Sequence, residues 1–247
     1  MQNILLEIEY LGTNYFGFQI QHKKNKSEIT VQSVLEKALG DLFKENIRIT
    51  ASGRTDRGVH AKAQVVNFKV NTKIPLANIK LALNTLLPSD VRIKKIKRMP
   101  LDFHARFSAK SKIYRYIILN SRDFSVFQKD FAWQLNLNLD LDKMRKAAKK
   151  LLGRRDFCVF AKQASKYKDC HRLLKKISIK KSKNRIFIDI EAEGFLRCMV
   201  RNIVSFLAKI GEGKLDAADT LDILSGKIPY INKPAPASGL YLYKVNY

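Results

Sequence analysis

Two kinds of hydrophobic repeat alternate along the 247-residue chain. Strict alternation of apolar and polar positions predicts strands, because successive side chains of a strand point to opposite faces. Apolar positions three and four apart predict helices, because such positions share one face of a helix. Alternation predicts strands over residues 4–10, 64–70, 91–98, 112–119, 185–194 and 239–247.

Four helices are expected between these strands. Thr30 can cap a helix whose apolar stripe runs from Val31 to Leu42. Pro75 suits the first position of a second helix, and Asp140 opens a third. The clearest helical pattern is "FLRCMVRNIVSFLAKIG", residues 195–211, in which apolar residues recur on one side.

Each half of the chain supplies strands and helices of a similar kind. This pattern predicts an α/β fold of two subdomains, although no repeat is visible residue by residue. We place the N-terminal subdomain at residues 1–104 and the C-terminal subdomain at residues 105–247, with the boundary falling between about 100 and 110.

Targeting and redox signals are weak. The start of the chain lacks a basic region followed by an apolar block, and no apolar run approaches the roughly 20 residues of a membrane span. We therefore expect a soluble, cytoplasmic protein with no membrane partner. Cysteines number three, with no Cys-x-x-Cys pair, and their spacing with His171 does not fit a structural zinc site. We expect Cys158, Cys170 and Cys198 to be reduced thiols, and no metal to be bound.

The net charge is the strongest indication of the kind of partner that the chain binds. The chain carries 47 lysines and arginines against 22 acidic residues, a formal net charge of +25. Such an excess repels itself in a compact state unless a polyanion is the partner. Nucleic acid is the leading candidate, because neutralised phosphates supply most non-specific affinity. A general lysine bias would explain part of the excess.

The segment "GRTDRGVHAKAQVVNF" combines charge of both signs with a turn. Asp56 lies between Arg54 and Arg57, with glycines on either side and His60 close behind. Asp-Arg-Gly is by itself more often a plain turn than a catalytic centre. An aspartate is ionised at neutral pH, and neighbouring guanidinium groups would keep it so even when desolvated. This is the profile of a carboxylate nucleophile or an electrostatic stabiliser.

An ordered set of motifs, which includes this one, resembles the tRNA pseudouridine synthase A family. The set extends over nearly the whole chain and comprises "YLGTNYFGFQIQ", "TVQSVLEKAL", "GRTDRGVHAKAQVVNF", "ALNTLLPSDVRI", "DFHARFSAKSKIYRYII", "GFLRCMVRNIV" and "PAPASGLYLYKVNY". The resemblance implies isomerisation of uridine to pseudouridine in the anticodon stem-loop of tRNA, typically at tRNA positions 38, 39 and 40. It implies no cofactor and no metal, a homodimer, and two α/β subdomains with a mainly antiparallel central sheet flanked by helices.

The resemblance also assigns residues one at a time. Asp56 matches the catalytic aspartate, and Arg201 a basic residue that pairs with it. Tyr114 matches the tyrosine that stacks on the target uracil, and Arg54 an arginine associated with flipping that base. The chain departs from the family in three places, which are Arg57 for a usual alanine, Leu11 for an aspartate and Phe18 for a tryptophan.

The residues around this assignment keep alternative interpretations. His60 is expected to order the Asp56 turn or to contact RNA. From alternation alone, Tyr114 is a strand residue that packs on its neighbours. Arg197 and Arg201 are four apart, so a helix through both would place them on one flank. His22, in "QIQHKKNK", is expected in a phosphate-contacting loop, although a disordered hairpin tip fits the same residues equally well.

Two other classes of protein share some of these features. A non-catalytic basic RNA-binding protein would share the charge, but would not need the Arg-Thr-Asp turn, the Tyr-Arg-Tyr strand and the Met-Val-Arg helix together. A nucleoside hydrolase would share the carboxylate, but usually has more acidic residues or a metal. The reaction product distinguishes the three classes.

Overall fold

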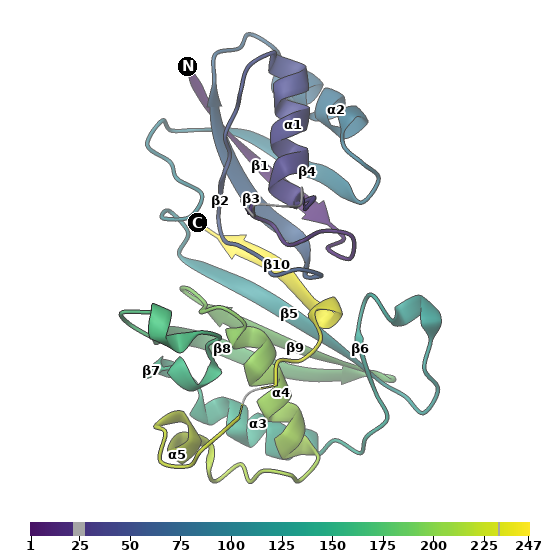
Figure 1. The fold of residues 1–247 in the computed structure, drawn as a ribbon, viewed down its shortest axis with the longest axis vertical. Coiled ribbons are helices and arrows are strands. Elements are labelled where there is room, and N and C mark those ends of the chain that lie inside the picture. Colours follow the sequence, from purple (N-terminus) through teal and green to yellow (C-terminus); the bar gives the residue numbers. More distant parts are fainter. Residues whose placement is uncertain (22–27, 232) are drawn as a thin grey trace. The chain divides into compact units, whose positions relative to one another are not determined.

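The computed structural model describes residues 1–21, 28–231 and 233–247, so the expected phosphate-contacting loop around His22 lies outside the described residues. The chain forms two compact units, each with strands and helices (Figure 1). The first unit comprises residues 1–110 together with 241–247, and the second comprises residues 111–240. The fold is therefore α/β with two units, as the sequence predicts.

The first unit is a mainly antiparallel sheet with two helices. Strands β4, β1, β3 and β10 lie side by side in that order, and the short β2 pairs with β3. Only β10 pairs in parallel, with Tyr241 opposite His60 on β3. The bounds are β1 Gln2–Tyr10, α1 Val31–Phe43, β2 Thr50–Ala51, β3 His60–Val70, α2 Leu76–Leu86, β4 Val91–Met99 and β10 Leu240–Asn246.

Local signals explain why α1 begins where it does. The Thr30 hydroxyl accepts a hydrogen bond from the backbone N–H of Ser33, and the Ser33 hydroxyl accepts one from the N–H of Thr30. This reciprocal pair satisfies two backbone donors that a helix start leaves unpaired. The buried face of α1 packs against the sheet, where the Phe43 ring lies 6.0 Å from that of Phe68 on β3.

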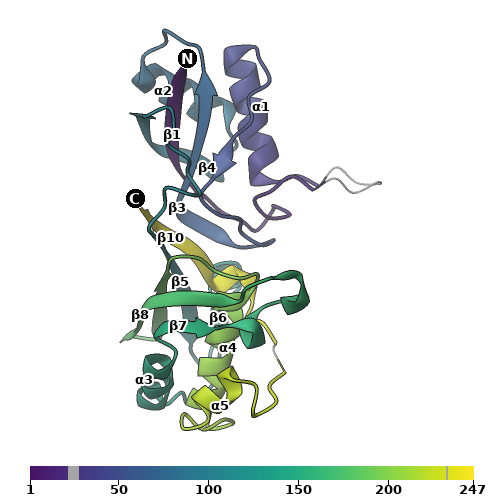
Figure 2. The same cartoon turned by 90° about the vertical axis from the view of Figure 1, so that its left-hand side faces the viewer.

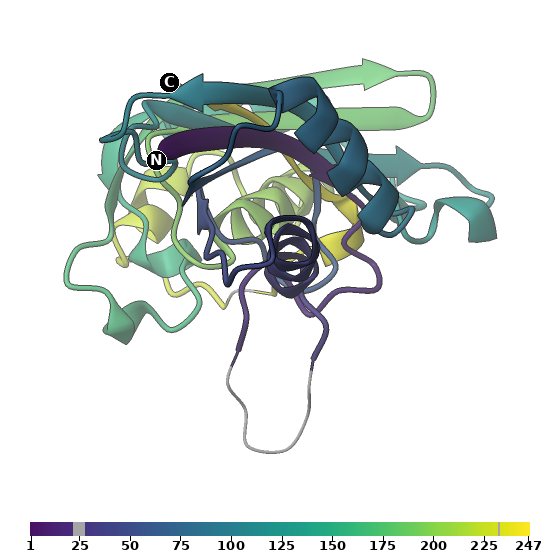
Figure 3. The same cartoon turned by 90° about the horizontal axis from the view of Figure 1, so that it is seen from above.

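The end of the chain belongs to the first unit, which a linear division at residue 104 does not anticipate. A small apolar cluster of Leu5, Val65 and Ala105 receives the Tyr247 ring, whose hydroxyl donates to the Ala105 carbonyl at 2.8 Å. Figure 3 shows the N- and C-terminal ends of the chain from above. Because β10 pairs with β3, the end of the chain contributes directly to the sheet that carries the Asp56 turn.

The second unit also contains a mainly antiparallel sheet, in the order β5, β9, β8 and β7, with β6 parallel to β5. Helix α3 packs against both α4 and β8, as Figure 2 shows. The bounds are β5 Ser111–Asn120, β6 Trp133–Leu135, α3 Leu141–Lys150, β7 Gly153–Asp156, β8 His171–Ser182, β9 Arg185–Ala192, α4 Met199–Gly211 and α5 Thr220–Leu224.

Helix α4 is shorter than its sequence pattern predicts. Cys198 has a positive φ of 59°, a left-handed conformation that interrupts the helix, so α4 begins only at Met199. The prediction that Arg197 and Arg201 share a helical flank is therefore wrong, because Arg197 lies before the helix. Within α4 every residue except Arg201 and Lys209 is buried.

The expectation that all three cysteines are reduced thiols is wrong for two of them. Cys158 and Cys170 form a disulfide, and their Cα atoms lie 5.2 Å apart. The antiparallel pairing of β7 with β8 places Asp156 opposite His171, which brings the two flanking cysteines together. Among the described residues, one cluster holds three potential metal ligands, Asp156 and these two cysteines, and its sulfurs are bonded to each other.

Candidate active site

Asp56 lies in the turn between β2 and β3 of the first unit, half-buried between a buried and an exposed neighbour. Thr55 is 7 % exposed, whereas the side chain of Arg57 extends into solvent. The Asp56 carbonyl accepts a hydrogen bond from the N–H of Val59 at 3.1 Å, which closes the turn. Gly58 within it has a φ of 77°, a conformation that favours glycine.

The residue before Asp56 is fixed from two sides. The hydroxyl groups of Tyr10 and Thr55 lie 2.8 Å apart, and both are buried. The Thr55 carbonyl accepts from the N–H of Phe18 at 3.1 Å. Because both contacts hold Thr55, the backbone immediately before Asp56 has little freedom, and its carboxylate starts from a defined position.

Two glycines allow the chain segment 11–18 to approach this turn closely. A Cβ atom on Gly12 would collide with the backbone of Val59. Gly17 has a φ of 91°, and a Cβ there would lie 2.8 Å from the Thr55 carbonyl oxygen. Both positions therefore require glycine, which explains the two glycines of "YLGTNYFGF".

His60 helps to hold the same turn in place. Its side chain is 0 % exposed and stacks on the Tyr241 ring at 4.7 Å. The ring atom Nδ1 accepts a hydrogen bond from the N–H of Gly12 at 3.0 Å, so that nitrogen carries no proton. Of the two roles expected for His60, this geometry supports ordering of the turn.

Gln64 completes the support. Its side chain accepts from the Ser52 hydroxyl at 2.7 Å and donates to the Gly53 carbonyl at 2.8 Å, at the start of the turn. Sequence reasoning did not assign a role to Gln64, Thr55 or Tyr10. The signal available in the sequence was the pair of hydroxyl side chains, Tyr10 and Thr55, near glycines of neighbouring motifs. A buried hydroxyl requires a hydrogen-bond partner.

The two arginines beside Asp56 are both exposed. The Arg57 guanidinium lies over the Phe16 ring, with its Cζ atom 4.1 Å from the ring centroid, so an aromatic face holds this side chain in place. Arg54 precedes Asp56 in the sequence, whereas Arg57 follows it, and Arg54 adds a second positive charge at the surface.

Tyr114 and Arg201 belong to the second unit. Tyr114, on β5, is 7 % exposed, and its ring meets that of Phe195 edge-to-face at 5.0 Å. Arg201, in the first turn of α4, donates from Nε to the Ala235 carbonyl at 2.6 Å, while its own carbonyl accepts from the Ala235 N–H. Arg201 thus ties α4 to the segment that leads into β10. Its pairing with Asp56 stays a prediction.

Similarity to known proteins decides the family. A family model described as tRNA pseudouridine synthase matches residues 7–108 and 147–247. The chain belongs to this family. It is 41% identical to tRNA pseudouridine synthase A of Thermoanaerobacter sp. (strain X514) over the full length of both chains. It is also 41% identical to the protein of that name from Oceanobacillus iheyensis, covering all of this chain and 97% of the relative.

A third relative gives the same result. The tRNA pseudouridine synthase A of Thermotoga neapolitana is 42% identical to this chain over 99% of both. The aligned lengths therefore cover both units, including the segments that contain Asp56 and Arg201. Among the helices that the structure describes, none has the length and apolar character needed to cross a membrane.

Proposed function

We propose that this chain is a tRNA pseudouridine synthase, which isomerises uridine in the anticodon stem-loop, typically at tRNA positions 38, 39 and 40. Membership of the family over both units supports this assignment. The structural observation that carries it is Asp56, a half-buried carboxylate in a turn fixed by Tyr10, Thr55 and His60. The net charge of +25 suits a tRNA partner.

The reaction requires a carboxylate of this kind. The N1–C1′ glycosidic bond breaks, the uracil turns, and C5 joins C1′. Asp56 can attack C1′, add to C6 of the base, or take the C2′ proton, and each route uses the ionised form. Each route also needs a position that excludes water, because water would divert the intermediate to cleavage of the base. A turn held by buried hydrogen bonds gives the Asp56 carboxylate a defined position.

The other site residues receive roles from the same assignment. Arg54 and Arg57 contact the RNA beside the reacting nucleotide, and Tyr114 stacks on the flipped uracil. Flipping a base out of a stem costs a few kcal/mol, and stacking on an aromatic ring offsets roughly 1–3 kcal/mol of this. Arg201 is proposed as a second catalytic residue. His60 acts as a positioning residue, since its ring is buried. The enzyme works as a homodimer in the cytoplasm and needs no cofactor.

Product analysis tests this proposal against the two other classes. The purified chain is incubated with an unmodified tRNA transcript, and the RNA is digested to nucleosides. Pseudouridine confined to the anticodon stem-loop is the expected result, and sequencing of the product locates the positions. Free uracil would indicate a nucleoside hydrolase. Bound but unchanged tRNA would indicate a non-catalytic RNA-binding protein.

A further inference from the structure

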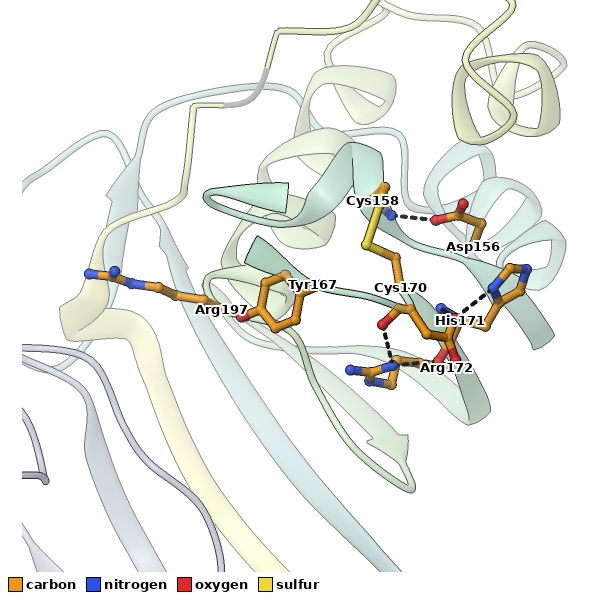
Figure 4. Close-up of a disulfide and its surroundings, with 8 residues drawn as sticks. Asp156, Cys158, Tyr167, Cys170, His171, Arg172 and Arg197 are labelled. Carbon is orange, nitrogen blue, oxygen red and sulfur yellow. Dashed lines mark hydrogen bonds and ion pairs between the residues drawn. A yellow bond between two sulfur atoms is a disulfide. The ribbon is translucent and has the colours of Figure 1, made fainter. Parts of the chain in front are cut away.

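A disulfide-closed loop in the second unit is not used by the site described above. Cys158 and Cys170 join the two ends of the loop, as Figure 4 shows, and the N–H of Phe157 donates to the Cys170 carbonyl at 3.2 Å. The loop is also anchored from within. Phe160 is wholly buried, and its carbonyl accepts from the buried side-chain amide of Asn202 on α4 at 2.7 Å. The loop therefore has a fixed base.

Three hydrogen bonds join this loop to Arg197, which lies two residues before the start of α4. The N–H of Lys162 donates to the Arg197 carbonyl at 2.9 Å. The Tyr167 hydroxyl accepts from the Arg197 N–H at 3.0 Å, and the Gln163 side chain accepts from the guanidinium at 3.2 Å. Figure 4 shows Tyr167 beside Arg197. The loop and Arg197 form one surface.

That surface is basic. Lys162, Lys166 and Lys168 lie in the loop, and all three are exposed, as is Arg197. The single acidic residue of the loop, Asp169, accepts from the N–H and from Nδ1 of His171, both at 2.8 Å. These hydrogen bonds hold the pKa of Asp169 below its usual value. The carboxylate thus bonds to the first residue of β8.

We propose that the loop Cys158–Cys170 and Arg197 together form a phosphate-binding surface for the tRNA substrate, held in its binding shape by the disulfide. The inference rests on the proposed function in taking tRNA as the ligand. Lysine and arginine contacts to phosphate position RNA without reading its sequence. A loop that is closed before binding loses less conformational entropy when the phosphates arrive, so closure favours affinity.

Because a disulfide can be reduced and formed again, the constraint on this surface is reversible. A dithiol reductant attacks one sulfur, releases the other cysteine as a thiol, and is itself oxidised when its second thiol resolves the mixed disulfide. Two electrons pass from the reductant to the protein, which gains two thiols. The opened loop keeps its lysines but loses the covalent constraint between its ends. We expect weaker tRNA binding in the reduced protein.

Filter binding of a tRNA transcript to the full chain, at several salt concentrations, tests the surface. In K162Q/K166Q/K168Q the disulfide stays intact, and we expect the Kd to rise on the order of ten-fold while the magnitude of the log–log salt slope falls by about two to three, or about 0.7–0.9 for each lost phosphate contact. The control K180Q/K181Q/K183Q removes the same charge from exposed positions of the β8–β9 hairpin. Equal effects in both triples would overturn the proposed surface.

The role of the disulfide is tested with oxidised protein, protein reduced by dithiothreitol, and C158S/C170S. Thiol titration of the denatured chain should count one thiol before reduction and three after, since Cys198 lies outside the disulfide. Opening the loop should raise the Kd for tRNA by roughly three- to ten-fold, as an ordering cost, and leave kcat at saturating tRNA unchanged. Lower thermal stability with an unchanged Kd would show that the disulfide only stabilises the fold, and would overturn this part.

The proposed surface and the proposed function can be overturned independently of each other. A chain that binds tRNA as described but forms no pseudouridine overturns the enzymatic assignment alone. A chain that forms pseudouridine with unaltered kinetics in K162Q/K166Q/K168Q overturns the loop surface alone. Circular dichroism of each variant establishes that it is folded, and the lysine triple keeps the surface falsifiable if C158S/C170S does not fold.

Discussion

The hydroxyl groups of Tyr10 and Thr55 lie 2.8 Å apart in the interior of the first unit, one residue before Asp56. Tyr10 comes from the end of β1 and Thr55 from the turn after β2, so this hydrogen bond joins two segments that are 45 residues apart. Burial raises the pKa of Tyr10 to about 12, which keeps its hydroxyl protonated and able to hold Thr55 at physiological pH.

The first prediction concerns this hydrogen bond. Tyr10→Phe removes one hydroxyl and leaves the ring, so the Thr55 side chain loses a partner. A buried hydrogen bond contributes about 0.5–1.5 kcal/mol, and we expect kcat to fall by roughly two- to ten-fold with little change in tRNA affinity. Single-turnover kinetics and filter binding measure the two effects. Tyr247→Phe is the matched control, because it removes a tyrosine hydrogen bond to the Ala105 carbonyl in the same unit but outside the Asp56 turn. An equal loss of kcat in both variants would contradict the positioning role.

The second prediction follows from the pKa of Tyr10. Above pH 10 the unfolded chain loses this proton while the folded chain retains it, so deprotonation favours the unfolded state. The free energy of unfolding should therefore fall between pH 10 and about 12 as far as Tyr10 contributes. Urea unfolding at several pH values measures this. Tyr10→Phe should show a shallower decline than the unmodified chain, and identical slopes would refute the assignment.

The third prediction separates two roles of Tyr114. Tyr114→Phe keeps an aromatic face, so we expect kcat/KM to change little, whereas Tyr114→Leu should lower it by roughly ten- to a hundred-fold, the equivalent of about 1–3 kcal/mol of stacking. Ile118→Val on the same strand controls for a loss of packing without loss of an aromatic ring. A loss of several orders of magnitude in the Phe variant would make the hydroxyl a participant in proton transfer. Unchanged kinetics in both Tyr114 variants would leave it a core residue only.

The fourth prediction uses the charge of the whole chain. With a net charge of +25, tRNA affinity should depend steeply on salt, with a log–log slope of about −0.7 to −0.9 for each phosphate contacted, and on the order of several contacts. Filter binding across a range of salt concentrations gives the slope. A nearly flat response would show that shape or base contacts dominate and that the lysines reflect a general bias of composition.

Much of the fold follows from local pattern. The alternation that predicts residues 4–10 corresponds to β1, and the expected Thr30 cap is the start of α1. Features that depend on distant contacts or on the conformation of a single residue are harder to predict from the local pattern. Apolar spacing extended α4 back to residue 195, because a single left-handed residue at Cys198 leaves the hydrophobic repeat intact. Strand β8 has few apolar residues and was not predicted.

The candidate site divides in the same way. Motif spacing singles out Asp56 as a candidate, because charge and glycines lie close together in sequence. The groups that hold its turn come from β1, β3 and the segment around Gly17, so their proximity depends on the folded sheet. The disulfide was missed for a related reason. An odd number of cysteines argues against pairing, and only the register of β7 against β8 brings Cys158 to Cys170.

The most direct test of the central claim is Asp56→Asn, which keeps the size of the side chain and removes its charge. Tritium release from tRNA labelled at C5 of uridine measures turnover, and filter binding measures affinity. Asp41→Asn, an exposed carboxylate on α1 paired with Lys37, is the matched control. We predict no detectable pseudouridine formation by the Asp56 variant, with tRNA affinity within a few-fold of the unmodified chain, because phosphate contacts carry the affinity. Retained turnover in Asp56→Asn would contradict the assignment.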